Sequence, residues 1–220
     1  MINTMTHEEL YKRYRDERDE WTEQFRTRVH RALSWLKRAE REANEPASAF
    51  IFLWIAFNAA YARIIDAQEA QTERDKYDSF LGYLVSSDRK KRIATMLFSQ
   101  YADTMEQLIN NKYVFFEYWQ RQLYPDSNVD WELSLSRSVL KANEAEKKGN
   151  AYNYLRIVLS RLHVLRNQLI HGAATWNGKT NLQQVQDAAM VMRQFVPLMI
   201  DVMMDNPDAE EWGDVLYPVQ

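Results

Sequence analysis

The chain has 220 residues, enough for one large domain with a sizeable buried core, and a net charge of −3 at neutral pH. That charge gives no overall positive field, so contact with a nucleic acid would need a local basic patch. Cysteine is absent, which excludes disulfide bonds, zinc–thiolate sites and cysteine nucleophiles and fits a reducing compartment.

We expect a soluble, cytoplasmic protein with no membrane partner. The N-terminus, MINTMTHEELYKRYRDERDE, is too charged for a signal peptide. The longest apolar run, AFIFLWIAFNAAYA, falls short of the ~20 residues that span a bilayer and is typical of a buried core helix. Glycine and proline number only five each, and no segment alternates with a period of two, so the sequence predicts an all-α fold.

The first half of the chain predicts a helical extension, two bundle helices and an insertion. Thr6-x-x-Glu9 has the form of a capping box, which opens a charged extension over 1–24 that we expect to project into solvent. Apolar residues at helical spacing then predict a helix at about 25–43, and an almost wholly apolar segment predicts a central helix at about 47–66. The segment 76–130 predicts a helical insertion, in which Asp88 to Arg92 is expected to open the longer helix.

The second half predicts two more long helices. A polar stretch over 132–150 leads to a helix at about 151–171, and a short loop separates it from a last helix at about 181–204, which Pro197 should bend. The tail over 205–220 is acidic and predicted to be irregular. The whole chain, 1–220, is thus expected to be a single domain. Its core would be a four-helix up-and-down bundle made of 25–66 and 150–204.

The helix at 151–171, AYNYLRIVLSRLHVLRNQLIHG with the glycine that follows, ends in an unusual group of polar residues. At 100° per residue its leucines share one face, whereas His163, Asn167 and His171 lie on a continuous polar stripe. Arg166 lies on the shoulder of the apolar face, where a guanidinium must reach solvent or find a partner. Gly172 is the expected cap, and the helix C-terminus favours a protonated imidazole at His171. An imidazole, which titrates near neutrality, beside a permanent cation suits proton transfer at a phosphodiester.

Arg166-Asn167-Gln168-Leu169-Ile170-His171 resembles the R-x4-6-H motif of the HEPN superfamily. The context is similar too, because the motif closes the third long helix of a predicted bundle, and WIAFNAAYA resembles the apolar second helix of HEPN domains. The resemblance covers 25–66 and 150–204, and leaves out the charged N-terminus and the insertion.

The resemblance implies a metal-independent endoribonuclease that needs no cofactor. In active HEPN enzymes the motif helices of two protomers meet in one cleft, so a homodimer is implied. His171 would act as acid or base at the ribose 2′-hydroxyl or the leaving 5′-oxygen, and Arg166 would stabilise the phosphate. Asn167 would orient the imidazole or the phosphate, and the product would carry a 2′,3′-cyclic phosphate. Family context suggests a prokaryotic toxin or defence effector, with cellular RNA as its target and an antitoxin protein as partner.

Other readings of these residues stay open. The chain can also be a catalytically inactive HEPN-like module that dimerises or binds protein, nucleotide or RNA. A third interpretation is a helical scaffold whose charged N-terminal helix engages a partner. Arg166 can pair structurally with a carboxylate such as Asp66, and a histidine near a helix end is a common stabilising choice.

Further residues are candidates for supporting roles. His163 can join the site or be solvated, and Asn58 can reach the site or make a buried structural hydrogen bond. Trp176, just after the motif, can stack on a base. The basic residues 89–92 can contact phosphates, although such runs are usually solvated. No metal-binding motif, phosphate-binding loop or nucleophile elbow is present, so no metal site is predicted.

Overall fold

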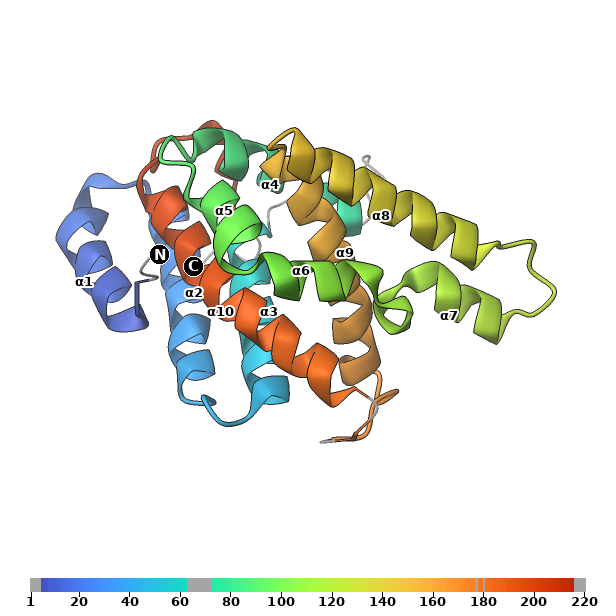
Figure 1. Cartoon of the computed structure of the whole chain (residues 1–220). Helices are drawn as coiled ribbons and strands as arrows, with labels where there is room; N and C mark the ends of the chain where they lie inside the picture. Colours follow the sequence, from blue (N-terminus) through green and yellow to red (C-terminus); the bar gives the residue numbers. More distant parts are fainter. Residues whose placement is uncertain (1–4, 63–72, 177, 180, 216–220) are drawn as a thin grey trace. The chain divides into compact units, whose positions relative to one another are not determined.

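The structure is a computed structural model that describes residues 5–62, 73–176, 178–179 and 181–215, with only the backbone of 73–76. Its described part is built from helices and contains no β-strand, which confirms the predicted all-α class (Figure 1). None of these helices is long and apolar enough to cross a membrane. The elements are α1 (His7–Glu17), η1 (Arg18–Glu20), α2 (Glu23–Glu40), α3 (Pro46–Tyr61), α4 (Glu73–Ser87), α5 (Arg92–Thr95), the π-helix η2 (Met96–Gln100), α6 (Ala102–Asn110), η3 (Lys112–Val114), α7 (Phe116–Leu123), α8 (Trp131–Lys147), α9 (Ala151–Ile170), α10 (Leu182–Met204) and η4 (Glu210–Trp212).

The chain divides into two compact units. The first consists of residues 1–93 and 192–220, and the second of residues 94–191. The four long helices expected from the sequence are present at nearly the expected bounds, as α2, α3, α9 and α10. Of these, α2 and α3 belong to the first unit, α9 to the second, and α10 runs through both. Their assembly into one bundle stays a prediction.

In the first unit α2 and α3 form a helical hairpin (Figure 1). The hydroxyl of Thr22 accepts a hydrogen bond from the backbone N–H of Phe25 at 3.2 Å and so caps the start of α2. Pro46 occupies the first turn of α3, where its fixed φ suits the helix and its missing N–H costs nothing. Large apolar side chains fill the space between the helices, including the buried Leu33 and Phe57.

A buried arginine ties the end of α3 to its neighbours. Arg28 of α2 has no exposed surface. Its Nη1 donates to the carbonyl oxygens of Ala60 at 2.7 Å and Ala62 at 2.8 Å, and its Nη2 donates to that of Gly213 at 3.0 Å. The last carbonyls of a helix have no partner within the helix and carry the negative end of its dipole. The guanidinium therefore satisfies the end of α3 and holds the C-terminal segment on it.

We expect Arg28→Met to lower the free energy of unfolding by about 3 kcal/mol, because three carbonyl oxygens lose the charged donor that a fully buried side chain supplies. Arg28→Lys should recover only part of the loss, since an ammonium lacks the planar fork of donors. Urea denaturation measures both. The matched control is Arg26→Met on the same helix, which should change stability by no more than about 0.5 kcal/mol. Equal losses for Arg26 and Arg28 would contradict the capping role.

The N-terminal helix α1 corrects one prediction. It is helical and charged, and Thr6 and Glu9 form the predicted capping box, but it does not project as a solvated extension. Leu10 and Tyr14 on one face are buried, and the Tyr14 ring stacks on His30 of α2. These two residues lie one turn apart and so share a face of the helix. The segment around them is so highly charged that the sequence did not predict this buried face.

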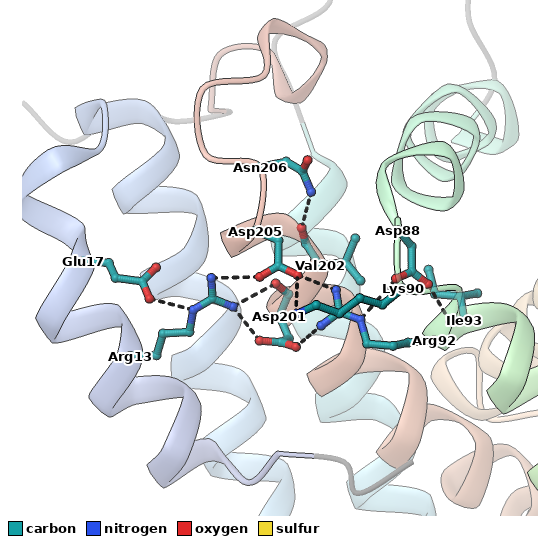
Figure 2. Close-up of polar contacts among 10 residues, drawn as sticks. All are labelled: Arg13, Glu17, Asp88, Lys90, Arg92, Ile93, Asp201, Val202, Asp205 and Asn206. Atoms are coloured by element: carbon teal, nitrogen blue, oxygen red, sulfur yellow. Dashed lines mark hydrogen bonds and ion pairs between the residues drawn. The ribbon is translucent and has the colours of Figure 1, made fainter. Parts of the chain in front are cut away.

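An ion-pair network also anchors α1 (Figure 2). Asp201 lies in the last turn of α10 and Asp205 directly follows the helix, at the end where carboxylates oppose the helix dipole. Arg13 of α1 reaches Asp201 at 2.6 Å and Asp205 at 3.0 Å. Arg92 pairs with the same two carboxylates and with the buried Asp88, the latter at 3.1 Å. The two guanidinium groups thus offset the unfavourable charge at the end of α10 and join it to α1 and α5.

The tail after α10 is more ordered than the sequence predicts. Its one indole, Trp212, lies in the short helix η4 and is buried, packing against Phe25, Phe80 and Tyr83. The Trp212 Nε1 donates to the carbonyl oxygen of Asn206 at 2.8 Å. The acidic residues on either side predicted an irregular, solvated segment, and they outweighed the anchoring effect of a single large ring.

In the second unit another buried arginine plays the part that Arg28 plays in the first. Arg161 of α9 is buried. Its Nε donates to the carbonyl oxygen of Ile109, at the end of α6, at 3.2 Å, and its Nη2 to the hydroxyl of Ser138 on α8 at 2.9 Å. Its guanidinium carbon also lies 4.4 Å from the centroid of the Phe115 ring. One side chain thereby fixes the rotation of α9 against α6 and α8.

Candidate active site at the end of α9

The motif helix α9 begins and ends where the sequence places it. The side chain of Asn150 accepts a hydrogen bond from the backbone N–H of Asn153 at 3.0 Å and caps the first turn. The predicted apolar face is confirmed, since Leu155, Leu159, Leu162 and Leu165 are all buried. The polar stripe therefore points away from that face, and the last turn carries the motif residues.

The end of α9 is closed by a Schellman motif. The backbone N–H of Gly172 donates to the carbonyl oxygen of Leu169 at 3.3 Å, and that of Ala173 to the carbonyl oxygen of Gln168 at 2.8 Å. Gly172 has φ +69°, the left-handed conformation that this cap requires. His171 is the C-cap residue itself. The backbone of His171 is therefore held between the helix and the hydrogen bonds of the cap. The predicted role of Gly172 as the cap is confirmed.

We expect Gly172→Ala to lower the free energy of unfolding by about 1 kcal/mol. A Cβ at this position would meet no atom within 4 Å, so the loss comes from the left-handed backbone alone. Gly172→Asn should be less costly, because asparagine tolerates this conformation better than alanine. Thermal unfolding of the three proteins measures the order. An alanine variant as stable as wild type would mean that the cap relaxes.

The structure brings two of the three motif residues together. The Nη1 of Arg166 donates to the side-chain Oδ1 of Asn167 at 2.8 Å, and Arg166 is half-buried. The imidazole of His171 is exposed and makes no hydrogen bond or ion pair with any described residue. The arrangement therefore consists of a partly buried cation, an amide that orients it and a histidine ring open to solvent.

A neighbouring segment packs beside these last turns. The side-chain Nε2 of Gln168, within the motif, donates to the carbonyl oxygen of Tyr113 at 2.8 Å. Two large apolar side chains near the end of α9 are exposed: Ile170, the last residue of the helix, is 52% exposed, and Trp176 in the loop that follows is 69% exposed. Both apolar side chains lie within five residues of His171 in the sequence.

The three supporting candidates lie in different surroundings. His163 is half-buried on α9, two turns before His171. Asn58 lies on α3 in the other unit, and its Oδ1 is buried without a hydrogen-bond partner among the described residues. Trp176 is exposed, as base stacking would require. Asp66, the carboxylate suggested as a structural partner of Arg166, lies outside the described residues.

The basic run corrects a second prediction. Residues 88–91 form a turn, and α5 begins only at Arg92. The buried Asp88 accepts a hydrogen bond from the backbone N–H of Ile93 at 2.7 Å, and Lys91 has φ +52°, so the chain turns before the helix starts. Arg92 is occupied by the carboxylates of Figure 2. Arg89, Lys90 and Lys91 are exposed, and the Lys90 Nζ lies 3.8 Å from a carboxylate oxygen of Asp205.

Two other buried ionisable groups in the second unit escaped the sequence analysis. Burial raises the pKa of Tyr154 on α9 to about 12, with a further contribution from Glu146 and Glu106, so its hydroxyl cannot serve as a base near neutrality. Burial also raises the pKa of Asp187 on α10, against the opposing effect of a hydrogen bond from Gln183. Neither residue stands out in sequence, because each lies at an ordinary position of a helical repeat.

Comparisons with known proteins give no relative for the chain. No family model matches it, and no curated protein or solved structure matches it significantly.

Proposed function

We propose that the chain is a metal-independent endoribonuclease of HEPN type. One observation carries the proposal: the imidazole of His171 is exposed at the hydrogen-bonded end of α9, in the same two turns in which Asn167 orients the guanidinium of Arg166. A general acid–base group and a phosphate-binding cation on one short, capped segment are what cleavage of a phosphodiester requires. The R-x4-H spacing adds the resemblance to the HEPN superfamily.

In the proposed reaction the 2′-hydroxyl of the RNA is the nucleophile. The imidazole of His171 takes its proton, and the 2′-oxygen attacks the adjacent phosphorus. The bond from phosphorus to the 5′-oxygen of the next nucleotide breaks, and an imidazolium returns the proton to that oxygen. The products are a 2′,3′-cyclic phosphate and a 5′-hydroxyl. Since the nucleophile belongs to the ribose, RNA is cleaved and DNA is not.

Arg166 would stabilise the charge that develops on the phosphate. A guanidinium can donate two parallel hydrogen bonds to phosphate oxygens, and this geometry depends on how its plane is held. A guanidinium carries five N–H donors, and the hydrogen bond from Nη1 to Asn167 uses one of them. Asn167 is therefore assigned a positioning role towards the guanidinium rather than contact with the reacting atoms.

The rest of the proposal follows the family resemblance. α2, α3, α9 and α10 would form the four-helix bundle, and 76–130 would be its insertion. Two copies would place their α9 ends in one cleft, where the exposed Ile170 and Trp176 supply apolar contact surface. A toxin or defence role in a prokaryote, with an antitoxin as partner, belongs to the same proposal.

Purified wild type should cleave RNA in the presence of EDTA. His171→Ala should reduce the rate by about 10²- to 10⁴-fold, because the proton-transfer group is lost, and Arg166→Ala by about 10²- to 10³-fold, because the phosphate loses its cation. Gel analysis of a labelled RNA under single-turnover conditions measures both rates.

The matched control for these variants is Arg156→Ala, which removes a cation from the polar stripe of the same helix two to three turns earlier. It should cleave at nearly the wild-type rate. His163→Ala tests the supporting role of that residue. Two results would contradict the enzyme proposal: a wild-type protein that leaves a broad panel of RNAs intact, or a His171→Ala protein that cleaves as well as wild type. The interpretation as a catalytically inactive HEPN-like binding module would then take its place.

A further inference from the structure

In the second unit a loop connects α7 to α8 (Figure 1). Residues of this connection line an open depression. Its volume is about 400 Å³, and its lining includes Arg121, Ser127, Asn128, Asp130, Trp131 and Glu132. Sites for small molecules and single bases fall in a range of roughly 300 to 1,000 Å³. The depression lies at the end of the predicted insertion and the start of α8, so the α9 motif does not account for it.

An indole forms the apolar part of this depression. Trp131 is the first residue of α8 and is half-buried, so part of its ring stays open. The ring of Tyr118 on α7 supports it edge-to-face, with ring centroids 5.0 Å apart and planes at 84°. Because Tyr118 and the helix start hold the indole in place, it is a rigid platform for a planar ligand.

The polar groups around the indole are mainly free acceptors. Glu132 and Asn128 make no hydrogen bond or ion pair with any described residue. Asp130 caps α8 through one carboxylate oxygen, which accepts from the backbone N–H of Leu133 at 3.0 Å, and its other oxygen is unused. The hydroxyl of Ser127 is buried without a hydrogen-bond partner among the described residues. Such groups suit a ligand with adjacent N–H donors.

One cation, Arg121, belongs to the lining of the depression, and a second, Lys112, lies over the indole ring of Trp131. The Arg121 Nη1 donates to the backbone carbonyl oxygens of Pro125 and Ser127, which holds the loop, and its charge remains at the rim. The Lys112 Nζ lies 5.8 Å from the centroid of the Trp131 ring. Arg121 gives the rim one positive charge beside the carboxylates of Asp130 and Glu132, so the lining offers a contact for a phosphate as well as acceptors for N–H donors. A base with donors on its edge and a phosphate attached would use both kinds of group.

We propose that this depression binds a guanine base. The Watson–Crick edge of guanine carries adjacent N1–H and N2–H₂ donors, which match the two oxygens of one carboxylate. Adenine, cytosine and uracil have no such adjacent pair. Guanine would stack on Trp131 and donate to Glu132, with its phosphate toward Arg121 and Lys112.

The source of the guanine is single-stranded RNA, and this part of the inference rests on the proposed function. The site would then give the enzyme a preference for RNA that contains guanine at a fixed position relative to the cut. A free guanine nucleotide has the same chemistry and is distinguished by the experiment.

The test is equilibrium binding by fluorescence anisotropy. The probes are labelled 2′-O-methyl hexamers, which cannot be cleaved through the 2′-oxygen: one of uridines only, one with a single guanosine and one with a single adenosine. Wild type should bind the guanosine hexamer about tenfold more tightly than the other two. Unlabelled GMP is added as a competitor to test whether the site binds a free guanine nucleotide. N-acetylarginine amide is added as a competitor to test whether it binds an arginine side chain.

The variants separate stacking from recognition of the edge. Glu132→Gln should abolish the preference for guanosine while leaving binding of the uridine hexamer unchanged. Trp131→Ala should weaken binding of the guanosine hexamer about tenfold, and Trp131→Phe should retain most of it. The matched control Glu146→Gln, an exposed carboxylate on the same helix outside the depression, should behave as wild type. Thermal unfolding establishes that each variant is folded.

Each outcome decides the proposal. A guanosine preference that Glu132→Gln removes supports the site even if the RNA-cleavage assay shows no activity, so the two proposals fail separately. Displacement by GMP without tighter binding of the guanosine hexamer assigns the site to a free nucleotide. Equal binding of the three hexamers with no effect of GMP, or displacement by N-acetylarginine amide, overturns the proposal.

Discussion

Each unit depends on one buried arginine that satisfies the end of a helix. A buried guanidinium is costly unless its donors are paired, and the last carbonyls of a buried helix are costly unless they find donors. Arg28 on α2 meets both needs at the end of α3, and Arg161 on α9 meets both at the end of α6. In each case the pairing of two groups that are unfavourable alone fixes how neighbouring helices are rotated and where they stop.

This constraint reaches the candidate site through α9. Arg161 holds the helix by Ile109 and Ser138, and on a rigid helix a fixed rotation also fixes the direction of the polar stripe. The Schellman motif then fixes the last turn, so His171 lies at a defined position while its ring stays open to solvent. The helix α9 positions the site from its N-terminal side, and the Gly172 cap positions it from its C-terminal side. Acid–base chemistry needs reacting groups that are held in place in this way.

The long helices could be predicted because their apolar residues recur at helical spacing, and Gly172 because only a left-handed cap explains it there. Arg28 and Arg161 could not, since an arginine in a helical repeat looks the same whether it faces solvent or a carbonyl oxygen 32 or 52 residues away in sequence. The packing of α1 escaped for the same reason: Arg13 finds its partners, Asp201 and Asp205, almost the whole chain away. Trp131 could not be singled out from the sequence, because its surroundings depend on how α7 packs on α8.

The most direct test of the proposed function is the chemistry of the RNA ends. Wild type would be incubated with an RNA of known sequence in EDTA, and the fragment ends would be identified by mass spectrometry. Attack by the 2′-hydroxyl predicts a 2′,3′-cyclic phosphate on one side of each cut and a 5′-hydroxyl on the other. Fragments that carry 3′-hydroxyl and 5′-phosphate ends would contradict the account, because water rather than the ribose would then be the nucleophile.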